Sequence, residues 1–210
     1  GQNFLTSSVK LLTIRFDISD PDGLKRSIDN VYNSFGGIDG LVNNAPSIHS
    51  GLIKDIDLSA WRTNFKANLD AVFLSLNILM PKMMEAGKGS IVNIASVVGL
   101  RGTAYMAGYA AAKAGLINLT KSAAIESAPN VRVNCVVPGA IFTEINQRAG
   151  LFDDDQAKKR LNSMAKIHAL GEIGTPEDIS EAVEYLINAR WTTGAILDVD
   201  GGLGLGLTED

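Results

Sequence analysis

The sequence predicts an α/β fold, a Rossmann-like doubly wound parallel sheet with helices on both faces, as a single domain over residues 1–210. Short apolar and β-branched runs alternate with longer helical stretches, which is typical of repeated strand–helix units. Each short run is apolar on both faces, as in a sheet covered by helices on both sides. With 46% hydrophobic residues among 210, the chain can bury one sizeable core.

The elements follow in order along the chain. A helix is expected to begin at Pro21, behind the acidic N-cap Asp20, and to end at Gly36-Gly37. The last helix has an equally clear start, because Thr175 precedes Pro176 and two acidic residues. The predicted strands span residues 11–16, 38–45, 89–96, 131–137 and 194–200, and the further helices span residues 57–86, 103–127, 152–168 and 176–189.

Composition excludes several classes of function. With 19 basic and 23 acidic residues the net charge is −4, which argues against nucleic acid as the main partner. Cys135 is the only cysteine, so an internal disulfide is excluded and a reducing compartment is expected. No apolar run is long enough for a membrane span, so we expect a cytoplasmic protein without membrane contact. His49 and His168 have no partner at metal-ligand spacing, so no metal site is predicted.

Three side chains indicate acid/base chemistry. Tyr109 and Lys113 are four residues apart in a predicted helix, so their polar ends share one face. A nearby ammonium group is expected to lower the pKa of the phenol toward neutrality, so that Tyr109 can exchange protons. Ser96 ends a predicted buried strand and should open onto the same cleft. Taken singly, each could have a structural role, such as Ser96 capping a turn.

The sequence resembles the short-chain dehydrogenase/reductase family. The likeness rests on Ser96, "YAAAK" (109–113), "NNAP" (43–46), Asn68 in "FKANLDAVF" and "PGAIFT" (138–143), which occur in the family's order and spacing. It implies reversible hydride transfer between NAD or NADP and a ketone, a 3-oxo compound or a secondary alcohol. Tyr109 would be the general acid/base, Ser96 would orient the substrate oxygen, and Asn68 would hold a water that relays protons to Lys113.

The resemblance also implies a set of cofactor-binding residues. Lys113 and Tyr109 would meet the nicotinamide ribose, and Ile94 would lie under the cofactor. The adenine and adenosine side would involve Asp17, Ile18, Asn43 and Ala45. The nicotinamide carboxamide would be surrounded by Pro138, Gly139, Ile141 and Thr143. Without the resemblance, Asp17 could equally belong to the turn that precedes the first helix.

One feature of the family is missing from the sequence. No glycine-rich turn, which would cradle the pyrophosphate, precedes residues 11–16. In the doubly wound order, residues 11–16 would be the third strand and residues 38–45 the fourth, with two absent strands between them. The N-terminal strands are therefore expected to be missing and the sheet to contain a hole, unless residues 11–16 pair directly with residues 38–45.

Two alternatives to the reductase hypothesis stay open at this point. The first is a catalytically silent relative with an incomplete cofactor site, which serves binding or assembly. The second is a sugar-nucleotide epimerase or dehydratase, which generally needs a larger C-terminal region. Members of this family commonly pair through the helices that correspond to 57–86 and 103–127, so the resemblance implies a homotetramer or a homodimer. The glycine-rich end "GGLGLG" is interpreted as a flexible tail.

Overall fold

The core of the fold is a parallel sheet of four strands. A computed structural model describes residues 10–141, 159 and 163–206. Within them the strands are β1 (Gly40–Asn43), β2 (Gly89–Ile94), β3 (Val131–Pro138) and β4 (Ile196–Val199), and they lie side by side in that order. The register sets Asn43 opposite Asn93, and Asn93 opposite Cys135. All the carboxyl ends therefore meet at one edge, and the predicted α/β class is confirmed.

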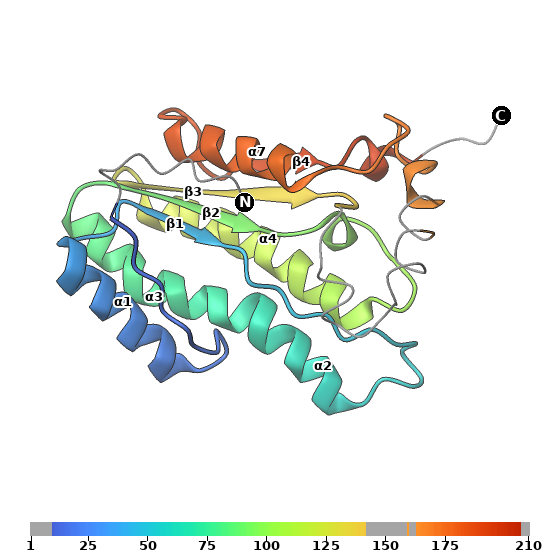
Figure 1. Cartoon of the computed structure of the whole chain (residues 1–210), viewed down its shortest axis with the longest axis horizontal. Helices are drawn as coiled ribbons and strands as arrows, with labels where there is room; N and C mark the ends of the chain where they lie inside the picture. Colours follow the sequence, from blue (N-terminus) through green and yellow to red (C-terminus); the bar gives the residue numbers. More distant parts are fainter. Residues whose placement is uncertain (1–9, 142–158, 160–162, 207–210) are drawn as a thin grey trace.

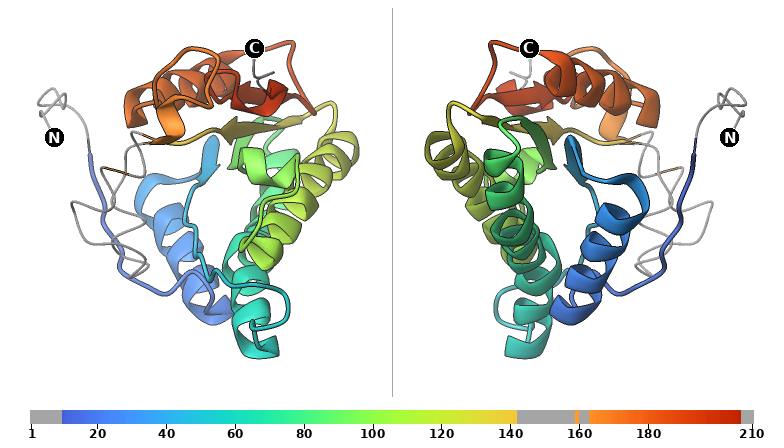
Figure 2. Two further views of the ribbon diagram at one scale, coloured as in Figure 1. Left: turned by 90° about the vertical axis from the view of Figure 1, so that its right-hand side faces the viewer. Right: turned by 90° about the vertical axis from the view of Figure 1, so that its left-hand side faces the viewer.

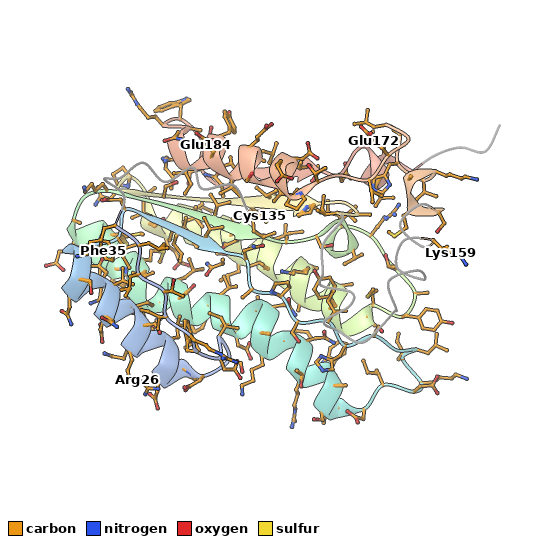
Figure 3. The ribbon with its side chains drawn as sticks, viewed as in Figure 1. Arg26, Phe35, Cys135, Lys159, Glu172 and Glu184 are labelled. Carbon is orange, nitrogen blue, oxygen red and sulfur yellow. The ribbon has the colours of Figure 1, made fainter. Side chains whose placement is uncertain are left out.

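Helices cover both faces of the sheet (Figure 1). Helices α3 (Ala71–Glu85) and α4 (Ala107–Ser127) pack on one face, with α1 (Pro21–Phe35) outside α3, while α7 (Pro176–Asn188) covers the other. The two end-on views show these three layers separately (Figure 2). Cys135 lies in the middle of the sheet and is completely buried, as predicted (Figure 3).

The helix starts that the sequence predicted are confirmed. The Asp20 carboxylate accepts a hydrogen bond from the Asp22 amide, and Gly36 ends α1 at a φ of 80°, where glycine is favoured. Thr175 and Asp178 form a reciprocal capping box at the start of α7. None of the helices in the described ranges is long and apolar enough to cross a bilayer.

Two long helices differ from their predicted extents. The predicted helix 57–86 is divided into α2 (Leu58–Phe65), a π-helical turn η1 (Lys66–Asp70) and α3. In the π-helical turn, which contains Asn68, the backbone hydrogen bonds span five residues instead of four. Helix α4 starts at Ala107 instead of residue 103, because the preceding turn holds Tyr105 at a φ of 67°. Most of the predicted helix 152–168 lies outside the described residues; within it, residues 163–165 are helical.

The prediction of a strand at residues 11–16 is wrong. This segment forms no ladder, because a cavity of about 610 Å³ separates it from β1. Leu12, Ile14 and Phe16 line one side of the cavity, and Leu41 and Val42 line the other. The hole that was expected in the sheet is therefore present as a cavity. Among the described residues, segment 11–16 does not pair directly with residues 38–45.

The C-terminal glycines are also more ordered than predicted. Residues Leu203–Leu205 form a short 3₁₀ turn, η3, and Leu203 is buried in the core. Asp200 accepts hydrogen bonds from the amides of Gly202 and Gly204, and Arg101 donates to the carbonyl of Leu203. Up to residue 206 this segment is consequently a folded turn, not a flexible tail.

A series of hydrogen-bonded polar side chains crosses the core between strands β1 and β2 and the helices that cover one face of the sheet. Ser75 donates to Asn43, Asn43 donates to Asn93, and Asn93 donates to Thr120 over 3.0 Å. Thr120 in turn donates to the Leu116 carbonyl in α4. Asn93 and Thr120 are fully buried, so the bond between them and the bond from Thr120 to Leu116 are shielded from water. The series connects the end of β1 with the helix that carries Tyr109 and Lys113.

We expect Thr120→Val to lower the free energy of unfolding by about 1–3 kcal/mol, because the Asn93 amide loses its buried acceptor. Urea denaturation measures this. The matched control is Thr63→Val, since Thr63 makes the same type of bond to the carbonyl four residues earlier and holds no second side chain. Equal effects of the two substitutions would show that the Asn93 contact contributes nothing.

Candidate active site

The carboxyl end of β2 carries the first predicted catalytic residue. Ser96 follows the strand by two residues and caps the short 3₁₀ turn η2 (Val97–Gly99), where its hydroxyl accepts from the Val98 amide over 3.4 Å. This turn presses closely on α4, because a Cβ atom at Gly99 would come within 2.9 Å of the Lys113 carbonyl carbon. Ser96 therefore has the structural role of a turn cap, and the turn that it caps lies against α4.

Tyr109 and Lys113 lie side by side in α4 and are almost completely buried, with 8% and 5% of their surfaces exposed. The Lys113 ammonium lies 5.6 Å from the centre of the Tyr109 ring. It donates a hydrogen bond of 2.7 Å to the carbonyl of Ile94, the last residue of β2. Helix α4 thus brings both side chains to the carboxyl edge of the sheet, on the side of Ser96.

The pKa of Tyr109 departs from the expectation drawn from the sequence. Burial raises it to about 12, and a hydrogen bond with Ser96 only partly opposes this. Burial also lowers the pKa of Lys113 to about 8, although the proximity of Cys135 opposes that shift. The predicted lowering of the Tyr109 pKa by Lys113 is therefore wrong in this structure, because burial dominates the shift and Lys113 is not among its causes. At neutral pH the phenol is protonated and the amine is mostly charged.

Asn68 is buried within the π-helical turn η1 and holds the segment after β1. Its amide nitrogen donates to the carbonyls of Ser47, over 2.6 Å, and of Asn64, and its oxygen accepts from the Ser47 amide. Asn64, one turn earlier, makes a similar pair of bonds to the backbone of His49. Asn64 is not among the residues predicted from the sequence, although its spacing of four residues from Asn68 is a signal that could have indicated it.

The cavity beside β1 brings several predicted residues together. Ile18, Asn43, Ala45, Asn68 and Lys113 all line it. Asp17 does not line it: the backbone amide and hydroxyl of Ser19 bond to the exposed Asp17 carboxylate, and these bonds lower its pKa. Asp17 is therefore a residue of the turn before α1, as the structural alternative predicted.

A second group of predicted residues lies past the end of β3. Pro138 is its last residue, and the Gly139 amide donates to the Val199 carbonyl of β4. A Cβ atom at Gly139 would come within 2.8 Å of the Asp200 backbone, so the close approach requires glycine here. Ile141 pairs with Gly174 through an isolated bridge. Thr143 lies outside the described residues.

The residues present fit one part of a nicotinamide dinucleotide. Most of the cavity is the apolar gap between segment 11–16 and β1, so its volume of about 610 Å³ is not the volume of a cofactor site. At Asn68 and Lys113, however, its apolar lining gives way to polar groups. A buried cation such as Lys113 is suited to hold ribose hydroxyls, whereas Ile94 is a buried core residue that does not line the cavity. The described residues contain no glycine-rich turn at a helix N-terminus that would bind the pyrophosphate.

Comparisons with known proteins agree with this geometry. A family model described as enoyl-(acyl carrier protein) reductase matches residues 3–204. The chain is 37% identical over 190 residues to 2-(S)-hydroxypropyl-CoM dehydrogenase 3 of Xanthobacter autotrophicus, covering 89% of this chain and 74% of that protein. The ligand-free aldohexose dehydrogenase of Thermoplasma acidophilum superposes with a TM-score of 0.89 at 32% identity, over 97% of this chain and 82% of that one. ElxO with NADP bound gives 0.82 at 30% identity, over 90% and 76%.

Fold, site and comparisons together define the class, an NAD(P)-dependent oxidoreductase built on a parallel α/β sheet. The length of the match is decisive, since it extends well beyond the segment around Tyr109 and Lys113. The chain belongs to the short-chain dehydrogenase/reductase family.

Proposed function

We propose that this protein catalyses reversible hydride transfer between NAD or NADP and a ketone, a 3-oxo compound or a secondary alcohol. The observation that carries the proposal is the buried cluster at the end of β2, where Tyr109 and Lys113 lie one helical turn apart in α4 and Lys113 donates to the carbonyl of Ile94. The names of two relatives, a hydroxypropyl-CoM dehydrogenase and an aldohexose dehydrogenase, support this type of reaction.

Tyr109 would act as the general acid in reduction. Its hydroxyl would give a proton to the carbonyl oxygen while hydride reaches the carbonyl carbon, so that one O–H and one C–H bond form as the C=O π bond breaks. The bound cofactor supplies the hydride in this direction and accepts it in the other. A pKa of about 12 supports this assignment, because Tyr109 then starts each reduction protonated at neutral pH.

The neighbouring residues would support that proton transfer. Ser96 would orient the substrate oxygen through its hydroxyl, which is close enough to Tyr109 to lower the pKa of the phenol. The Lys113 ammonium would stabilise the phenolate that remains after the transfer and would bind the nicotinamide ribose. Asn68 would hold the water through which protons reach Lys113. The remaining cofactor contacts would come from Ile18, Asn43, Ala45, Ile94, Pro138, Gly139, Ile141 and Thr143.

Titration of the purified protein with NADH and with NADPH, followed by nicotinamide fluorescence, tests the proposal directly. We expect saturable binding of at least one of them, and cofactor-dependent reduction of a member of a panel of aliphatic ketones and 3-oxo thioesters. Binding of neither cofactor would favour the silent alternative, in which the site is incomplete. Binding without turnover of any carbonyl compound would contradict the catalytic part of the proposal alone.

We also propose that the protein is a cytoplasmic homotetramer or homodimer. Large apolar side chains remain exposed on the two helices that were expected to pair, among them Leu58 and Phe73 on α2 and α3 and Ile125 on α4. Burial of this surface against a second copy would remove it from water. The unbridged thiol of Cys135 is compatible with a reducing compartment. Light scattering of the purified protein measures its assembly state.

A further inference from the structure

His168 is a buried side chain that joins two segments beyond the end of β3. Only 2% of its surface is exposed, and both of its ring nitrogens have a partner. Nδ1 lies 2.6 Å from the carbonyl oxygen of Met164, and Nε2 lies 3.3 Å from the backbone nitrogen of Ala140. The spacing of His168 in the sequence predicts no metal site, and its hydrogen-bond partners are evident only in the fold.

The two contacts define which nitrogen carries the proton. The Met164 carbonyl can only accept, so Nδ1 must be the donor. The Ala140 amide can only donate, so Nε2 must carry a free lone pair. The two contacts therefore fit the tautomer of His168 that carries its proton on Nδ1. The imidazole bridges a carbonyl from its own turn and an amide from the segment after β3.

The segment 138–141 depends on this bridge. The Gly139 amide and the Ala140 carbonyl bond to backbone groups, of Val199 and Gly174 respectively. The Ala140 amide bonds instead to a side chain, His168. The imidazole is also packed against the turn after β4, because a Cβ atom at Gly201 would come within 3.3 Å of the His168 ring. Loss of the ring nitrogen would leave the Ala140 amide without its partner.

We infer that His168 is a positioning residue that holds segment 138–141 in the shape that receives the nicotinamide carboxamide. This inference rests on the proposed function, which assigns Pro138, Gly139 and Ile141 to that end of the cofactor. His168 acts through the Ala140 amide and contacts no reacting atom. Its effect should therefore fall on cofactor affinity more than on the chemical step.

A pair of substitutions separates this role from simple core packing. His168→Asn keeps an amide near Nδ1, facing Met164, but removes the acceptor for Ala140. His168→Gln reaches the position of Nε2 and keeps an acceptor for Ala140. For His168→Asn we expect about tenfold weaker NADH or NADPH binding, since a buried amide loses its bond. The KM for the cofactor should rise in parallel, with kcat changed less than about threefold. His168→Gln should restore binding to within about twofold.

Hydrogen exchange at the Ala140 amide gives a readout that is independent of activity. In the wild type without cofactor we expect this amide to exchange as slowly as amides of β3, and in His168→Asn to exchange much faster. Fast exchange in the wild type would overturn the inference even if His168→Asn did not fold. Equal loss of affinity in both variants would also overturn it, because the lost packing alone would then explain the effect. A wild type that binds neither cofactor would overturn the proposed function itself, whereas cofactor binding that is unchanged in His168→Asn would overturn only the role of His168.

Discussion

Tyr109→Phe should lower kcat for carbonyl reduction by about 10²–10⁴-fold, because it removes the only proposed proton donor and leaves the ring in place. Cofactor affinity should change little, since the substitution removes one hydroxyl. The free energy of unfolding should fall by about 1 kcal/mol, because the hydrogen bond with Ser96 is lost. Steady-state kinetics measures kcat, cofactor titration measures the affinity, and urea denaturation measures the free energy of unfolding, all on the same preparation.

The matched control is Tyr105→Phe. Tyr105 precedes α4 by two residues and is 58% exposed, so the loss of its hydroxyl should leave kcat unchanged. The result that would contradict the role of Tyr109 is full turnover in Tyr109→Phe. A loss of turnover that is matched in Tyr105→Phe would point to a general disturbance of this segment instead.

Lys113→Met should abolish most turnover and yet stabilise the fold at pH 7. Burial lowers the pKa of Lys113 from 10.5 to about 8, a gap that corresponds to roughly 3 kcal/mol of unfavourable folding energy when the amine is charged. The lost bond to the Ile94 carbonyl offsets part of this, so we expect a net gain of about 1–2 kcal/mol in the free energy of unfolding. Urea denaturation at pH 7 measures it.

The pH dependence distinguishes this effect from a packing effect. Between pH 8 and 10.5 the folded state has released the Lys113 proton while the unfolded chain still binds it, so wild-type stability should rise with pH across this window. Lys113→Met should lack that rise. Turnover of the wild type should fall as the pH passes about 8, because the ammonium charge that stabilises the phenolate is lost. The exposed Lys121, also on α4, provides the control Lys121→Met, for which neither effect is expected.

Much of the site could be predicted because its parts are local. The spacing of four residues in a helix is enough to put Tyr109 beside Lys113, and a strand end is enough to put Ser96 at the carboxyl edge. Helix starts at Asp20 and Thr175 depend on side chains within three residues of each cap. The strands β2 and β3 were recognised because both of their faces are apolar and buried.

The remaining features depend on partners distant in sequence. The segment 11–16 has the residue types of a strand, but a strand also needs a neighbouring strand to bond with. Here a cavity lies between this segment and β1, so the two do not pair. The π-helical turn at Asn68 arises from packing that no local pattern encodes. The hydrogen bonds of Asn64 join it to the backbone of His49, which is 15 residues away in the sequence. The role of His168 was invisible because its partners are backbone groups, whose positions composition and spacing do not reveal.

By itself the sequence determined the α/β class, the parallel strands β1 to β4 and the group of Ser96, Tyr109 and Lys113, since these follow from periodicity and from spacing within single elements. Only the tertiary structure decided how those groups titrate. Desolvation depends on everything that surrounds a side chain, and here it raises the pKa of Tyr109 to about 12 and lowers that of Lys113 to about 8. The identity of the neighbours is local, but the exclusion of water is a property of the whole fold.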